Sequence, residues 1–382
     1  MMTSKKRIIG RMDEIAKQNE PKYVDVQCLK KSKRVLLFLA DFFIVFILSL
    51  GLFHLGVFPL GRVITDYNGQ MTSLHESQVR RDDILYHYEL LFPRAEGARG
   101  YDDFEENLVF TADHYIHRMV DEAQLEKYDV FAGYFLKIRA DQSAFVSFYR
   151  DLDKGYDFFD ITDSSVTLKD TYKQEFLPAF NERDTMSEKG QKDYQTFEDK
   201  IFSRGYGVML NDIMEKDLTK DGVSYINEQK TITNVLQYGK MLMVICAVAS
   251  LLIVWLINHI IIPMFSKNRK TIGMMAMRIT RVHRSNFDVL SLPMVYLSAT
   301  YALAGEMLGC LFVPWGATSF NELFALPMLF ILSLISLVYI LGSLAMILFD
   351  GYNRSIGDFL CRSYCLSEDE FDNLIREKGY KA

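Results

Sequence analysis

Ionisable residues at the edges of membrane-length apolar runs are the part of this sequence best suited to chemistry. Arg34 and Asp41 open the first such run, KSKRVLLFLADFFIVFILSLGLFHLGVF, and they are seven residues apart. Seven residues make almost two helical turns, so both side chains are expected on one face of a helix. Because a charge within a bilayer costs roughly 2.5–3.5 kcal/mol on insertion scales, Asp41 is expected to be partnered. The two residues form either a proton or ion site or an ion pair that positions the helix.

A second charge cluster follows the last apolar run, in LFDGYNRSIGDFLCRSYCL, where Asp350, Arg354 and Asp358 are spaced four apart. If a helix continues past the membrane, the three side chains stack on one face with alternating sign, at the level of Arg34. Gly351 lies within the cluster and disfavours an unbroken helix.

Glu306 is an acidic residue within the third apolar run, and His54 and His259 lie in the first and second. A carboxylate in a low-dielectric bundle binds a proton more readily unless a cation partners it, as a proton- or cation-coupled pathway requires. Asp41 is expected toward the inner side of the membrane and Glu306 toward the outer third of its span. Glu306 is equally well explained as a residue near a helix end that reaches the interface.

These residues carry a resemblance to a known family. An Arg entering the first membrane helix, an Asp seven residues later and a late Arg-x-x-x-Asp (Arg354 to Asp358) resemble the RDD family of membrane proteins. The segment RKTIGMMAMRITRV is similar to that family's Gly-x-Thr-x-Gly-Lys loop through Thr271 and Gly273, with Arg269 at the first Gly position and Met274 at the Lys position. The resemblance covers roughly residues 30–62 and 236–366, and it implies a membrane protein without implying an activity.

The charge distribution divides the chain into an acidic region and a basic remainder. Residues 63–235 hold 34 acidic and 20 basic residues, a net charge of −14, and the rest of the chain carries +8. The sequence therefore predicts an acidic soluble domain inserted into a basic membrane protein, all of it α-helical.

Four apolar runs are long enough to cross a hydrocarbon core of about 30 Å, which takes roughly 20 helical residues. The predicted segments are an N-terminal segment (1–34), helix one (35–62), the inserted acidic domain (63–235), helix two (236–265), a basic loop (266–288), helix three (289–314), helix four (323–349) and a C-terminal tail (350–382).

The positions of Lys and Arg predict the orientation. Residues 1–34 hold ten Lys and Arg and residues 266–288 hold six, whereas residues 318–321 hold none. Because short cytoplasmic segments are enriched in these residues, both termini and the basic loop are expected in the cytoplasm and residues 63–235 outside, across a plasma membrane that we expect to be bacterial.

The inserted domain reads as amphipathic helices. ESQVRRDDILYHYELLF, FEENLVFTADHYIHRMVDEAQLEKY and KDYQTFEDKIFSRGYGVMLNDIMEKD place apolar residues three and four apart. Strand signals are scarce, and VTL near Val166 is the best short one. The many aromatic residues are expected in a bundle core or at a membrane-facing rim.

Two features of this domain resemble metal sites. Four aspartates between Asp151 and Asp160 flank Gly155. Gly155, Tyr156 and Thr162 stand where an EF-hand calcium loop needs other residues, so a solvated acidic turn is favoured. His114 and His117 are three residues apart, and surface histidines are favoured over a zinc site.

The sequence offers no signature of an enzyme. It has no phosphate-binding Gly-x-x-x-x-Gly-Lys, His-Glu-x-x-His or nucleophile elbow, so no catalytic activity, cofactor or metal is expected. The net charge of −14 on the inserted domain argues against nucleic acid as a partner.

Two functions from different classes follow. The first is transport of a proton or monovalent cation through Asp41 with Arg34 and Asp358. Four spans are few for a carrier, so this function implies a homo-oligomer, with Ala304, Gly305 and Gly309 as packing positions. The second is a sensor or assembly factor whose inserted domain binds an extracytoplasmic partner.

Overall fold

The computed structural model describes residues 7–12, 22–95, 101–121, 129–181, 185–314 and 327–377. The chain divides into two compact units, which we describe separately. The membrane unit comprises Met1–Tyr67 and Gly239–Ala382, and the inserted unit comprises Asn68–Tyr238. The predicted link around residues 318–321 and the end of the predicted tail lie outside the described residues.

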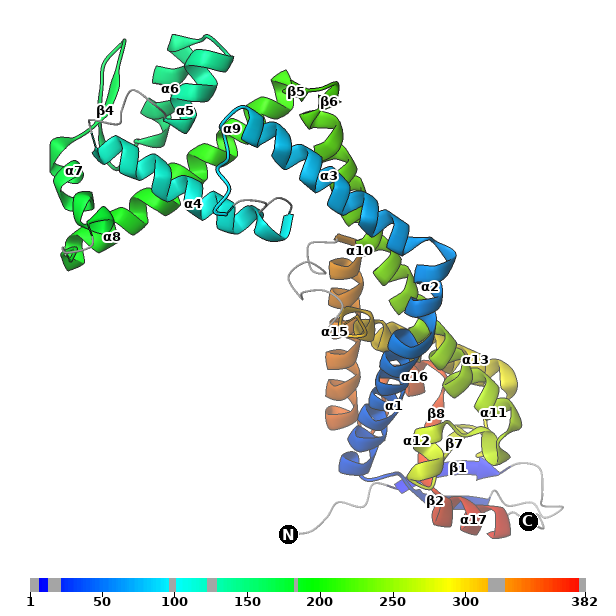
Figure 1. Ribbon diagram of the computed structural model, residues 1–382. Coiled ribbons are helices and arrows are strands. Elements are labelled where there is room, and N and C mark those ends of the chain that lie inside the picture. The colour runs from blue at the N-terminus through cyan, green and yellow to red at the C-terminus, as the bar shows by residue number, and fades with distance from the viewer. Residues whose placement is uncertain are drawn as a thin grey trace. The chain divides into compact units, whose positions relative to one another are not determined.

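The membrane unit is built almost entirely from helices (Figure 1). Its elements in chain order are β1 (Arg7–Met12), β2 (Lys22–Gln27), α1 (Lys31–Leu52), the π-helix η1 (Phe53–Val57), α2 (Phe58–Ile64), the membrane part of α10 (Tyr225–Leu256), the π-helix η6 (Ile257–Ile261), α11 (Ile262–Phe265), η7 (Lys267–Arg269), α12 (Ile272–Ala276), β7 (Ile279–His283), α13 (Leu292–Glu306), η8 (Met307–Leu311), α15 (Pro327–Phe349), α16 (Ile356–Leu360), β8 (Ser363–Ser367) and α17 (Glu368–Glu377).

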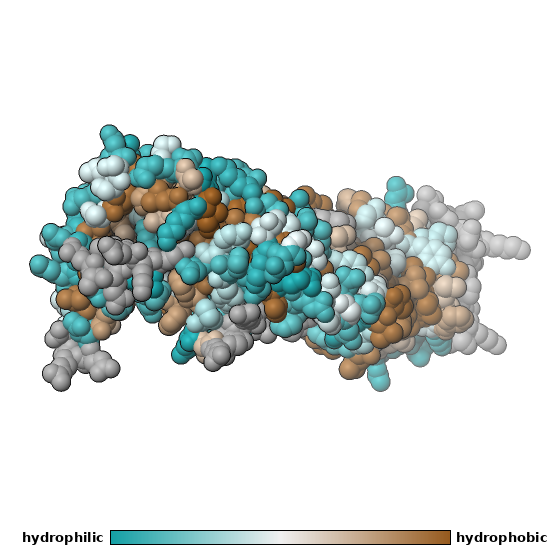
Figure 2. Space-filling view, turned by 45° about the horizontal axis from the view of Figure 1, so that its top comes forward, coloured by the Kyte–Doolittle hydropathy of each residue, from teal (hydrophilic) through white to brown (hydrophobic). Residues whose placement is uncertain are grey.

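Among the described residues, four helical segments are long and apolar enough to cross a membrane. They are Lys31–Ile64, Tyr225–Phe265, Leu292–Leu311 and Leu329–Phe349. Large apolar side chains such as Ile47, Met241 and Val338 are exposed on them, and Figure 2 shows broad hydrophobic areas on this part of the surface. Since apolar side chains in a bilayer need no protein cover, the chain is an all-α polytopic membrane protein, as predicted.

The third span is shorter than its apolar run. The run was expected to be helical from Val289, but α13 begins at Leu292, with Ser291 in an extended conformation before it and Pro293 in its first turn. Proline is favoured in the first turn because its fixed φ suits a helix and its missing N–H would have no partner there. In Figure 1, α13 runs obliquely to α1 and α15.

The segments that connect the spans at one end of the membrane unit pack against one another. β7 precedes α13 and pairs antiparallel with β8, which follows α15, with Ile279 opposite Ser367 and His283 opposite Ser363. The Leu29 amide, just before α1, donates a 3.2 Å hydrogen bond to the carbonyl of Cys365 in β8. Figure 1 shows β1, β2, α12 and α17 at the same end of the unit. The segments before α1, between α11 and α13, and after α15 therefore lie together.

The inserted unit is also mainly helical, with four-residue or shorter strands. It contains α3 (Tyr67–His87), α4 (Tyr101–Val120), α5 (Val130–Ala132), the π-helix η3 (Gly133–Ile138), α6 (Gln142–Leu152), β3 (Phe159–Ile161), β4 (Val166–Leu168), α7 (Asp170–Phe176), η4 (Leu177–Phe180), α8 (Glu188–Thr196), the π-helix η5 (Phe197–Phe202), α9 (Ser203–Lys216), β5 (Thr219–Lys220), β6 (Val223–Ser224) and the first part of α10. The short strand predicted at VTL is β4, which pairs with β3.

Aromatic side chains fill the core of the inserted unit. Phe131, Phe197 and Phe202 are fully buried and surround Tyr115, with ring centroids 5.1–6.4 Å apart. Of the two expected places for the aromatic residues, the bundle core is therefore the one that these occupy. Because the unit has its own core, it is a domain in its own right.

Candidate functional site

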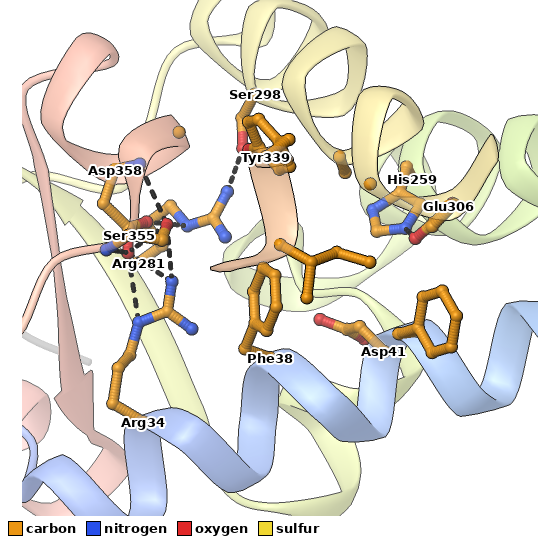
Figure 3. A pocket seen from close by; sticks show the side chains of 15 residues that line it. Arg34, Phe38, Asp41, His259, Arg281, Ser298, Glu306, Tyr339, Ser355 and Asp358 are labelled. Atoms are coloured by element: carbon orange, nitrogen blue, oxygen red, sulfur yellow. Dashed lines mark hydrogen bonds and ion pairs between the residues drawn. The ribbon is translucent and has the colours of Figure 1, made fainter. Parts of the chain in front are cut away.

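A small cavity of about 60 Å³ lies within the membrane unit (Figure 3). Helices α1, η6, α13, α15 and α16 and strand β7 contribute its walls, and its polar lining residues are Arg34, Asp41, His259, Arg281, Ser298, Glu306, Tyr339, Ser355 and Asp358. Such a volume holds a few water molecules or one small ion. The cavity brings together charges that are far apart in the sequence.

Arg34 and Asp358 form an ion pair at one end of the cavity. Arg34 Nε donates to Asp358 Oδ2 at 3.0 Å, and its Nη2 donates to the same oxygen and to Ser355 Oγ. Arg281 approaches from β7, with its Nε 3.3 Å from Asp358 Oδ1. Arg34 is 3% and Asp358 2% exposed. One buried carboxylate therefore pairs with two guanidiniums and balances one of their two positive charges.

The local sequence positions Asp358. Ser355 and Asp358 form a capping box at the start of α16, in which the Asp358 amide donates to Ser355 Oγ and the Ser355 amide donates to Asp358 Oδ2. Burial alone would raise the pKa of Asp358, but Arg34 and Arg281 outweigh burial and lower the pKa to about 2. This carboxylate therefore stays ionised and holds α1, β7 and α16 together.

Asp41 lies further along α1 and binds the start of α12. Its Oδ1 accepts hydrogen bonds from Thr271 Oγ1 at 2.9 Å and from the Gly273 amide at 3.2 Å. The Thr271 hydroxyl also caps α12 by accepting from the Met274 amide at 3.3 Å. A Cβ on Gly273 would overlap Asp41 Oδ1, so a larger residue at this position requires the carboxylate or α12 to move. The Thr-x-Gly sequence thus forms a cradle for this carboxylate.

Glu306 and His259 form a third polar contact in the cavity wall. Glu306 Oε1 lies 2.6 Å from His259 Nε2, and both side chains are more than nine-tenths buried. Glu306 Oε2 is buried and has no hydrogen-bond partner in the part of the chain that the structure describes. His259 and Asn258 belong to η6, and Asn258 Oδ1 accepts from the Ile272 amide at 3.1 Å. π-Helical turns within longer helices are frequent at functional sites.

The cavity holds one more carboxylate than guanidiniums. Asp41, Glu306 and Asp358 are three carboxylates, and Arg34 and Arg281 are two guanidiniums. His259, 2.6 Å from Glu306, supplies the third positive charge when it is protonated. When His259 is neutral, one carboxylate charge is not balanced, and an unbalanced buried charge is costly. A single proton or a single monovalent cation would balance it.

The expected relationship between Arg34 and Asp41 is realised only in part. Both side chains line the cavity, but each bonds to a residue of a later segment: Arg34 to Asp358 and Asp41 to Thr271 and Gly273. The expectation that Glu306 lies at a different level from Asp41 is wrong, since both line one cavity and the oblique α13 carries Glu306 to His259.

The predicted ladder of Asp350, Arg354 and Asp358 does not form. α15 ends at Phe349, Asn353 has φ of 56°, and a new helix begins at Ile356. Arg354 instead binds Asp350, with Nε to Oδ2 at 2.9 Å and Nη2 to Oδ1 at 3.2 Å. The two residues do not line the cavity.

Aromatic rings complete the Arg354 site. The Arg354 guanidinium lies 4.9–5.7 Å from the ring centroids of Tyr352, Phe359 and Tyr364. The ion pair lowers the pKa of Asp350 against the effect of burial. Arg354 and Asp350 therefore stabilise the turn after α15.

Sequence reasoning missed Arg281 and Asn258 as site residues. Arg281 was counted only among the basic loop residues, although it lies between Thr280 and Val282, which are fully buried. The sequence pattern Ser355-x-x-Asp358 is typical of a capping box and could have predicted that a helix begins at Ile356. His259, a minor candidate, lines the cavity, whereas His54 is exposed on η1.

The candidate metal features of the inserted unit are occupied by other interactions. Asp153 accepts from the amides of Phe158 and Phe159 and forms a turn in which Gly155 has φ of 95°. The ring of His114 packs beside Phe92, and that of His117 stacks on Phe180. Within the described residues, no three His, Cys, Asp or Glu side chains are grouped to hold a metal.

No protein-family model, no curated protein and no solved structure matches the chain. The fold defines the class, a polytopic α-helical membrane protein, and the site defines a buried charge cluster within it.

Proposed function

We propose that this protein carries a proton or a monovalent cation across the membrane through the cavity between Asp41 and Glu306. The observation that carries the proposal is the charge balance: three carboxylates face two guanidiniums and the titratable His259, and Glu306 Oε2 has no hydrogen-bond partner among the described residues. Binding one proton or one cation neutralises the cavity, and releasing it restores the charge. The cavity volume of about 60 Å³ fits such a small species.

The contacts of the motif residues support membership of an RDD-type family. Three of the four Arg and Asp residues that carry the resemblance contact other parts of the same pattern: Arg34 binds Asp358, and Thr271 and Gly273 bind Asp41. The fourth, Arg354, binds Asp350 instead. A sequence pattern whose members touch is better explained by a shared site than by chance spacing.

We propose that the protein lies in a bacterial plasma membrane, with both termini in the cytoplasm and the inserted unit outside. The gathering of the segments before α1, after α11 and after α15 at one end of the membrane unit supports this orientation. The basic residues of those segments assign that end to the cytoplasm.

A homo-oligomer remains part of the proposal because four spans are few for a carrier. Its interface does not use the glycines that the sequence suggested. A Cβ on Gly305 would meet Tyr339 of α15 at 3.1 Å, and one on Gly309 would meet Leu251 of α10 at 3.0 Å. These glycines allow α13 and η8 to approach other helices of the same chain.

Ion flux into proteoliposomes tests the proposal. Purified protein is reconstituted, and pH and sodium gradients are imposed in turn while internal pH and sodium are recorded. We expect flux in the wild type and the rate of empty liposomes in Asp41→Asn and Glu306→Gln. Asp372→Asn is the matched control, because Asp372 is an exposed carboxylate on α17.

The second candidate function is a sensor or assembly factor in which the charge cluster only locks the helices. The independent core of the inserted unit favours this candidate, because a domain of this kind can bind an extracytoplasmic partner. Absence of flux in folded wild-type protein under both gradients would favour the sensor and contradict transport.

A further inference from the structure

The inserted unit contains a groove of about 530 Å³ that the proposed transport does not use. We propose that this groove binds a carboxylate attached to an apolar group, as found in a peptide C-terminus or a free apolar acid. The groove lies between α6 and α9, beside η3, and its lining residues are Phe135, Arg139, Ala144, Ser147, Phe148, Asp151, Leu152, Lys154, Arg204, Val208 and Asp212.

Apolar side chains form the floor of the groove. Phe135, Phe148 and Leu152 are buried among the core residues, and the exposed Val208 adds to one wall. Phe135 and Phe148 have ring centroids 4.7 Å apart. A volume of this size and an aromatic floor are typical of sites that enclose the apolar part of a ligand.

Two cations in the groove have no partner among the described residues. Lys154 and Arg204 are exposed, and neither makes an ion pair or a hydrogen bond with another side chain of the part of the chain that the structure describes. Arg139 differs from both, because its Nη1 lies 2.8 Å from Asp212 Oδ2 and its guanidinium lies 5.4 Å from the Phe135 ring centroid. Lys154 and Arg204 are thus the two groups that can receive a ligand anion.

The charge of the groove selects a monoanion. Arg139, Lys154 and Arg204 face Asp151 and Asp212, an excess of one positive charge in a unit whose residues 68–238 carry a net charge of −13. A carboxylate balances this excess, whereas a phosphate dianion would exceed it and be repelled by Asp151. The planar guanidinium of Arg204 can bind both oxygens of a carboxylate.

Gly205 fixes the position of Arg204 relative to the floor. A Cβ on Gly205 would lie 2.8 Å from Leu152 Cδ1 and 2.9 Å from Phe131 Cζ, so the absent side chain lets α9 approach α6 and the core closely. Arg204 is the adjacent residue and is held beside Leu152 in the groove wall. The cation and the apolar floor are therefore close enough for one ligand to reach both.

The test uses the full chain in nanodiscs and measures binding by calorimetry. The probes are a short peptide ending in phenylalanine with a free carboxylate, the same peptide as its C-terminal amide, and N-acetylphenylalanine. We expect the free-carboxylate peptide to bind at least about tenfold more tightly than the amide, because one charge-assisted contact is lost. Equal binding of N-acetylphenylalanine would identify a free acid as sufficient, and tighter binding of the peptide would identify a chain terminus.

Variants locate the site. Arg204→Ala and Lys154→Ala should each weaken binding of the carboxylate by roughly tenfold or more, and Arg150→Ala should not. Arg150 is the matched control because it is an α6 arginine that pairs with the exposed Asp163 and does not line the groove. Equal binding of acid and amide, unchanged binding in Arg204→Ala, or no binding of either acid at millimolar concentration would overturn the proposal. Ion flux does not enter this test, so its outcome is independent of the transport proposal.

Discussion

The Gly273 amide donates a 3.2 Å hydrogen bond to Asp41, and the carboxylate occupies the space that a side chain on residue 273 would need. A membrane-helix carboxylate is thereby held by the first turn of a helix from the basic loop. This contact joins α1 to α12 and leaves the rest of the Asp41 side chain facing the cavity.

Gly273→Ala tests this cradle. The new Cβ would overlap Asp41 Oδ1, so either α12 or Asp41 must move, and overpacking of this kind costs about 1–3 kcal/mol of unfolding free energy. Chemical denaturation measures the loss. Gly207→Ala in α9 is the control, because nothing lies within 4 Å of its Cβ, and it should be neutral or slightly stabilising. Equal stability of Gly273→Ala and wild type would refute the cradle.

Arg34→Met should be strongly destabilising. It leaves Asp358 buried with Arg281 as its remaining cationic partner, and breaking a buried pair typically costs about 3–5 kcal/mol. The double variant Arg34→Met/Asp358→Leu should lose less than the sum of the two single variants, because the charges are removed together. Additive losses would show that the two residues do not interact.

The stability of the membrane unit should fall in acid. The pKa of Asp358 is about 2 in the folded protein and about 4 when unfolded, so its contribution is complete above about pH 4 and is lost as the pH falls toward 2. The loss is on the order of 2 kcal/mol. Tryptophan fluorescence can follow it, because Trp255 belongs to the membrane unit and residues 68–238 contain no tryptophan. Asp358→Asn should flatten this dependence, and an unchanged slope in that variant would assign the loss elsewhere.

The inserted unit should show the opposite dependence on pH. Burial raises the pKa of Asp129 to about 6, although Tyr149 and the amides of Phe131 and Ala132 partly oppose this shift. A raised folded pKa favours the protonated form, so the contribution of Asp129 to stability is complete below about pH 4 and is lost as the pH rises through about 6. Near-ultraviolet circular dichroism during denaturation at a series of pH values measures the stability of the inserted unit. Asp129→Asn should remove the decline, and a decline that persists in the variant would contradict this assignment.

The sequence predicted the spans well because twenty apolar residues in a row have few other stable environments. It predicted the partners of the charged residues poorly. Helical periodicity relates residues three, four or seven apart, whereas Arg34 and Asp358 meet across 324 positions. Asp350 and Arg354 do pair at four residues, but a turn rather than a helix brings them together, and Arg281 was missed because it reaches the cavity from a short strand. The oblique course of α13, which carries Glu306 to His259, follows from packing that no local pattern encodes.

The central claim is that the cavity takes up one proton or one monovalent cation. Infrared spectroscopy of the protein in lipid tests it most directly, because a carboxylic acid and a carboxylate absorb differently. We expect a carboxylic-acid band that changes with pH, responds to sodium if a cation competes, and is lost in Glu306→Gln or Asp41→Asn but retained in Asp372→Asn. A band that is absent or indifferent to both variants, in protein that remains folded, would contradict the account.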